Sequence, residues 1–128
     1  MDYRRTLLAA GVLGITGIAL GAFGAHAFAA GLAERGMTRS WESASRYHLL
    51  HAVALLGLAI WQRQGPHPRR AIAWAARLWV VGTVLFSGSL YALALGGGRW
   101  FGPVTPLGGV AFMAGWALIA AAAWMKEE

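Results

Sequence analysis

Four long apolar stretches constrain this chain more than any other feature, because together they fill most of its length. They cover roughly residues 6–28, 41–62, 71–96 and 104–125 of the 128-residue sequence. A helix needs about 20 apolar residues to cross the hydrocarbon core of a bilayer, so each stretch is long enough for one crossing. The sequence therefore predicts a single all-α domain, residues 1–128, in which four transmembrane helices form a membrane-embedded bundle.

The composition excludes a soluble fold. Hydrophobic residues make up 58% of the chain and charged residues only 12%, whereas soluble domains carry about 25% charged residues. A chain this short cannot bury so much apolar surface within itself, so we expect the lipid bilayer to cover it. The apolar stretches are continuous and do not alternate with period two, which excludes the strands of a membrane β-barrel.

The basic residues predict the orientation of the chain in the membrane. With four crossings, both termini and the loop around residues 62–70 share one side, and Gly65, Pro66 and Pro68 in that loop favour a break between helices. Seven basic residues belong to that side: Arg4, Arg5, Arg63, Arg69, Arg70, Arg77 and Lys126. Four belong to the other: Arg35, Arg39, Arg46 and Arg99. The positive-inside rule then predicts an inner-membrane protein with both termini in the cytoplasm.

The first apolar stretch also resembles a secretory signal, because Ala25-His26-Ala27 follows it as a small-residue cleavage site. The stretch exceeds the usual signal core of about 7–15 residues, which favours a retained helix.

Small residues recur at helical spacing and predict close helix packing. Lipid tails are as apolar as leucine, so helices in a membrane associate where small side chains let their backbones approach. The residues concerned are Gly11, Gly14, Gly17, Gly21, Gly24, Gly108 and Gly115. We expect those in the first helix to form a continuous seam for a neighbouring helix, a second copy of the chain or a membrane-protein partner. A backbone-lined ion path is the alternative interpretation.

A group of polar residues in the apolar stretches marks the candidate site. It comprises His26, Glu42, Arg46, Tyr47, His48, His51, Ser87, Ser89 and Tyr91. Ionisable groups inside a membrane are costly, so each is a functional candidate by default. Glu42 and Arg46 are four residues apart and can pair, and His48 and His51 share one helix face.

Three interpretations of the histidines stay open. In the first they are structural, with neutral rings that bond a carbonyl, Ser87, Ser89 or Tyr91. In the second, His26, His48 and His51 bind zinc or copper and leave an open fourth position. In the third they hold a haem or a quinone, or relay protons. No cofactor motif accompanies them, so we expect no cofactor.

Signatures of the common enzyme classes are absent. The sequence has no G-x-S-x-G, no phosphate-binding glycine loop, no H-E-x-x-H and no cysteine. Basic residues flank the apolar stretches, which favours lipid headgroups over nucleic acid as their partners. The sequence thus favours a non-catalytic structural or interaction protein. The alternatives are a protein that handles a metal, haem, quinone or proton, and a small transporter or channel subunit.

Four segments together carry a family resemblance. They are Gly21 to Ala27, Trp41 to Ala52, Phe86 to Tyr91 and Thr105 to Gly109. They resemble an uncharacterised family of small inner-membrane proteins that includes the bacterial protein YgdD. The resemblance implies four membrane spans and supplies no activity, ligand or catalytic residue. The family usually carries glutamine or a similar polar residue at position 48, which leaves His26 and His51 as the family-like pair.

Overall fold

All the secondary structure that can be described in this chain is helical. The computed structural model describes residues 1–64 and 68–126, and no strand occurs among them. The elements in order are α1 (Tyr3–Ala25), α2 (Ala29–Glu34), α3 (Thr38–Arg63), α4 (Arg69–Gly82), the π-helix η1 (Thr83–Ser87), α5 (Gly88–Ala94), the short 3-10 helix η2 (Arg99–Phe101) and α6 (Val104–Ala122). The prediction of an all-α fold is therefore confirmed for the described residues.

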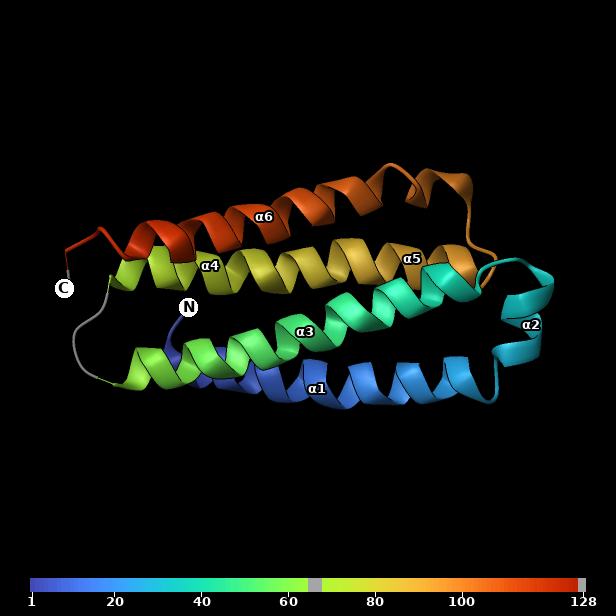
Figure 1. Cartoon of the computed structure of the whole chain (residues 1–128), viewed down its shortest axis with the longest axis horizontal. Helices are drawn as coiled ribbons and strands as arrows, with labels where there is room; N and C mark the ends of the chain where they lie inside the picture. The colour runs from blue at the N-terminus through green and yellow to red at the C-terminus, as the bar shows by residue number, and fades with distance from the viewer. Residues whose placement is uncertain (65–67, 127–128) are drawn as a thin grey trace.

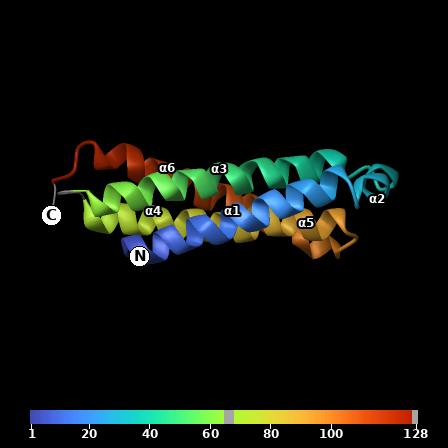
Figure 2. The same cartoon turned by 90° about the horizontal axis from the view of Figure 1, so that it is seen from below.

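The long helices run along one axis and form two neighbouring pairs. Figure 1 shows α1 beside α3, and α6 beside the rod made by α4, η1 and α5. Both chain ends, the end of α3 and the start of α4 lie at one end of the molecule, while α2 and η2 lie at the other (Figures 1 and 2). This placement brings the basic residues of the two ends to opposite tips of the molecule.

The helix boundaries depart from the expected ranges in three places. The first helix runs over Tyr3–Ala25 and stops before the end of its apolar stretch, because the backbone of His26 leaves the helical region, with φ −126° and ψ −85°. The short helix α2 occupies the expected loop. The third stretch is a rod with a π-helical turn at its centre. Gly65 and Pro66 lie outside the described residues, whereas Pro68 directly precedes α4.

Three helical stretches are long and apolar enough to cross a membrane. They are Tyr3–Ala25, Arg69–Ala94 and Arg99–Ala122. Helix α3 is the longest single helix, at 26 residues. Its first half carries Arg39, Glu42 and Arg46, so its sequence is less apolar than the other three. The structure thus confirms a helical protein with three stretches that could span a membrane. A fourth span, formed by α3, is proposed below.

Two clusters of buried side chains hold the helices together. One surrounds Trp79 and Phe112 near the middle of the molecule, and the other surrounds Trp41 and Tyr91 near the tip that carries α2. Large apolar side chains such as Ile15 remain on the outside, where that side chain is 73% exposed. An apolar exterior of this kind is what a surrounding bilayer requires.

The glycines of α1 form an interrupted seam. A Cβ atom at Gly17 would lie 2.7 Å from Leu49, and one at Gly24 would overlap the indole of Trp41. Around the other three glycines of the expected seam a Cβ would meet nothing within 4 Å; they are Gly11, Gly14 and Gly21. Within this chain, α3 therefore comes within contact distance of an added Cβ at two of the five glycines. The packing role of the others stays a prediction.

Candidate functional site

His48 is the centre of a buried polar network between α1, α3 and α5. The side chain is 5% exposed. Its Nε2 lies 3.1 Å from Thr16 Oγ1 and its Nδ1 lies 3.1 Å from the hydroxyl of Tyr91. Thr16 already donates its hydroxyl proton to the carbonyl of Val12, at 2.8 Å. The network is therefore satisfied when Nε2–H donates to Thr16 and Nδ1 accepts from Tyr91.

His51 lies one turn deeper along α3 and is oriented toward α6. Its Nδ1–H donates to the carbonyl of Tyr47 at 2.8 Å, and its Nε2 accepts from the indole N–H of Trp116 at 3.1 Å. The ring stacks on Phe112, with ring centroids 3.7 Å apart and planes inclined by 6°. With one nitrogen donating and the other accepting, the neutral form of the ring satisfies every hydrogen bond available to it.

The two histidines therefore leave no ring nitrogen free. A metal or a haem iron binds the lone pair of an imidazole nitrogen. His51 Nε2 accepts from Trp116, and His48 Nδ1 accepts from Tyr91 in the tautomer that satisfies the network. A ligand at either ring would have to displace Tyr91 or Trp116 from a buried position. The geometry matches the structural interpretation of His48 and His51, and Tyr91 is among the partners expected from the sequence.

The three histidines do not converge. His26 ends α1 on the exposed surface, His48 faces α1 and α5, and His51 faces α6. Among residues 1–64 and 68–126, no group of three or more histidine or acidic side chains could hold a metal ion. The three-histidine metal centre does not form, because the helix turns His48 and His51 toward different neighbours and places His26 outside both clusters.

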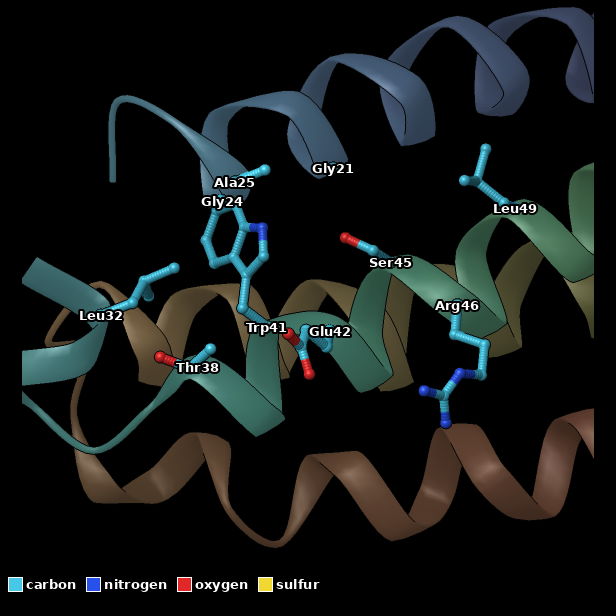
Figure 3. Close-up of a pocket in the computed structure, with 10 residues that line it drawn as sticks. All are labelled: Gly21, Gly24, Ala25, Leu32, Thr38, Trp41, Glu42, Ser45, Arg46 and Leu49. Carbon is cyan, nitrogen blue, oxygen red and sulfur yellow. The ribbon is translucent and has the colours of Figure 1, made fainter. Parts of the chain in front are cut away.

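Glu42 and Arg46 lie on the outside of α3. Both are exposed, and in Figure 3 their side chains point away from α1, whereas Trp41 points toward it. Arg5 and Asp2 form the single ion pair found in the described part of the chain, so the expected Glu42–Arg46 pair is not formed. Both side chains lie toward the end of the molecule that carries α2. There the aliphatic part of an exposed side chain can extend so that its charged group reaches water.

The serines of the candidate group tie the α4–α5 rod to its neighbours. Ser87 donates to the carbonyl of Ala44 in α3 at 2.8 Å. Ser89 shares a hydrogen bond with Thr105 at the start of α6. Tyr47 is 41% exposed, and its ring packs against Phe86. The candidate residues thus fall into helix-bridging groups rather than one reactive centre.

A small cavity opens beside this network between α1 and α3. It has a volume of about 250 Å³, and its wall includes Gly21, Trp41 and Ser45 (Figure 3). Ser45 Oγ lies 3.4 Å from the hydroxyl of Tyr91, which in turn bonds His48. A line of hydroxyl groups therefore joins the cavity to the buried imidazole.

Sequence reasoning missed three members of the network. Thr16 and Trp116 complete the bonds of the two histidines, and the indole of Trp41 donates to the carbonyl of Leu20 at 2.8 Å. A signal existed for two of them. Thr16 is a polar residue inside an apolar stretch, and Trp116 lies in the middle of its helix rather than at a membrane interface.

The chain is similar to a family of uncharacterised proteins, both by its family model and by its individual relatives. Residues 20–109 match the model of a family described as protein of unknown function, DUF423. The chain is 42% identical to the UPF0382 inner membrane protein YgdD of Escherichia coli K12, over 93% of this chain and 88% of that protein. It is 37% identical to the UPF0382 membrane protein SH2409 of Staphylococcus haemolyticus, over 80% of each chain. No solved structure matches.

Proposed function

The chain belongs to the DUF423 family of unknown function, and from that premise we propose a non-catalytic, four-span inner-membrane protein. In this proposal both termini lie in the cytoplasm. The protein acts by associating, within the bilayer, with a second copy of itself or with another membrane protein.

The fourth span is α3. Its 26 residues extend about 39 Å at 1.5 Å per residue, enough to cross the hydrocarbon core. It lies alongside α1, and the two histidines in its interior are internally bonded. The tip that holds both chain ends carries seven basic residues against four at the other tip, which supports a cytoplasmic location for both termini.

The observation that carries the non-catalytic assignment is the state of His48 and His51. All four of their ring nitrogens hydrogen-bond within the chain. These are the most buried ionisable side chains between the helices. Groups held in this way fix the relative positions of helices. In the described residues no group of three or more histidine or acidic side chains could hold a metal ion.

The test is to purify the protein in mild detergent, record its absorption spectrum and measure bound metals. The same measurements are made on a His48→Asn, His51→Asn double variant. We expect a colourless protein with metal well below one ion per chain, and no spectral difference between the two forms. A Soret band or one equivalent of zinc or copper that the double variant loses would overturn the assignment.

Association in the bilayer is tested by photo-crosslinking in native membranes. A crosslinking side chain replaces Ile15, which faces outward from α1. We expect a discrete crosslinked species that contains either two copies of the chain or one other membrane protein. A chain that stays monomeric from several outward positions, including Val53 on α3 and Met113 on α6, would contradict the proposal.

A further inference from the structure

An apolar groove runs between α1 and α4 on the half of the molecule that holds the chain ends. Both helices begin at that end of the molecule (Figures 1 and 2), and Ala10 of α1 belongs to the same buried cluster as Ile72 and Ala76 of α4. The groove encloses about 330 Å³, and its walls include Leu8, Ala9 and Leu13 of α1 and Val80 of α4. Its walls are apolar apart from Arg5 at one end, so its lining suits a hydrocarbon chain.

A basic pocket lies at the outer end of this groove. It has a volume of about 490 Å³ and is formed where α1 begins, α3 ends and α4 begins. Arg63 is the last residue of α3, Arg69 is the first of α4, and both side chains line the pocket. Met1 lines both cavities, so the basic pocket and the apolar groove are neighbours.

The pocket has excess positive charge. Its only acidic residue is Asp2, whose carboxylate accepts from the backbone N–H of Arg5 at 3.0 Å and pairs with that residue's guanidinium at 3.7 Å. The Arg5 N–H is the main cause of a lowered pKa for the Asp2 carboxyl, which stays ionised and engaged. Within residues 1–64 and 68–126, neither Arg63 nor Arg69 pairs with a carboxylate. The two like charges in one pocket therefore favour an anion between them.

We propose that this composite site binds an anionic phospholipid of the cytoplasmic leaflet. The phosphate lies between Arg63 and Arg69, and one acyl chain lies in the groove along α1. Arginine guanidinium groups bind phosphate through two parallel hydrogen bonds, and basic pockets between membrane helices on the cytoplasmic side suit anionic headgroups. The assignment of this site to the cytoplasmic leaflet depends on the proposed orientation of the chain. The site itself depends only on contacts within the chain.

The test measures lipid retention by the full-length protein in detergent, using native mass spectrometry. Phosphatidylglycerol, phosphatidylcholine and inorganic phosphate are each added as probes. We expect retention of phosphatidylglycerol alone. An Arg63→Gln, Arg69→Gln variant should bind it about tenfold or more weakly. The matched control, Arg4→Gln with Arg70→Gln, removes the same charge from the same tip outside the pocket and should bind as the unaltered protein does.

A second variant tests the groove without changing any charge. Ala9→Phe fills the acyl-chain site and should lower retention of phosphatidylglycerol, whereas Ala22→Phe on an exposed position of α1 should not. Equal retention of phosphatidylcholine, equal loss in the Arg4, Arg70 control, or full competition by inorganic phosphate would each overturn the proposal. Lipid binding in detergent does not depend on orientation or on association, so failure here is distinguishable from failure of the proposed function.

Discussion

At the scale of single residues, this protein pairs every ring nitrogen of its two buried histidines within an apolar molecule. Two other buried polar atoms, Trp79 Nε1 and Gln62 Oε1, have no hydrogen-bond partner among the described residues. His51 is 1% exposed, yet both ring nitrogens are bonded and one ring face stacks on Phe112. In lipid no water is available to replace a lost hydrogen-bond partner. A polar group left without any partner in the bilayer core therefore costs several kcal/mol. Measured hydrogen bonds between membrane helices contribute less, about 0.6–2 kcal/mol, because the unfolded chain in the membrane also finds partners.

Replacing His51 separates stacking from hydrogen bonding. His51→Phe keeps a ring against Phe112 and loses both hydrogen bonds, so we expect a loss of about 1–2 kcal/mol in unfolding free energy. His51→Ala also opens a cavity and should cost about 3–5 kcal/mol. The measurement is denaturant unfolding in detergent micelles, with Tyr47→Phe on the exposed face as the control. A His51→Phe protein as stable as the original would show that the two bonds contribute nothing.

Two glycines predict opposite effects of one substitution. A Cβ atom at Gly108 would overlap the backbone nitrogen of Phe86, and backbone cannot move aside as a side chain can. Gly108→Ala should therefore lower the unfolding free energy by about 1–3 kcal/mol. At Gly11 a Cβ meets nothing within 4 Å, so Gly11→Ala should raise it by about 0.5–1 kcal/mol. Heating followed by size-exclusion chromatography ranks the two variants, and the reverse order would refute this packing.

At the scale of elements, the α4–α5 rod is the one that positions the network. Its π-helical turn, η1, lies where Gly108 of α6 packs on Phe86 and where Ser87 reaches the carbonyl of Ala44. A π-turn holds one more residue than the α-helical turn it replaces, and such turns are frequent at functional sites. Ser87 faces α3 while Ser89 faces the start of α6, because side chains two residues apart on a helix point in nearly opposite directions.

Deleting Val84 from η1 should be better tolerated than deleting Leu78 from α4. Removal of one residue from a π-turn restores an α-helix and leaves both flanking segments in register. Removal of Leu78 instead rotates the following residues by about 100°, which takes Trp79 out of the core. We expect the Val84 deletion to purify as a monodisperse protein and the Leu78 deletion to aggregate. Aggregation of both to the same extent would mean that η1 is required for folding.

At the scale of the whole molecule, the two tips differ in the number of basic residues that they carry. The tip with the chain ends holds the basic pocket, while the other holds α2, whose flanking Arg35 donates to the carbonyl of Ala94 at 2.8 Å. That bond joins the end of one helix pair to the other. A four-span chain places these tips on opposite membrane faces, which is testable because the sequence contains no cysteine.

Single cysteines report which face each tip occupies. We expect Ala33→Cys in α2 to react with a membrane-impermeant maleimide in cells whose outer membrane is permeable to the reagent. Gln64→Cys and Lys126→Cys should react only after the inner membrane is broken. All three positions are exposed. Equal labelling of Ala33→Cys and Gln64→Cys in intact cells would show that α3 does not cross the membrane.

The sequence by itself determined the helical membrane class and the apolar stretches, since hydrocarbon burial depends on composition and length and needs no knowledge of neighbours. Only the tertiary structure decided which groups meet. Spacing predicted that His48 and His51 share a helix face, yet one bonds Tyr91 and the other Trp116, because the two rings lie under different helices. The same holds for the glycines of α1, which are equivalent in the sequence. An added Cβ would meet side chains of α3 at Gly17 and Gly24, whereas at Gly11, Gly14 and Gly21 it would meet nothing within 4 Å.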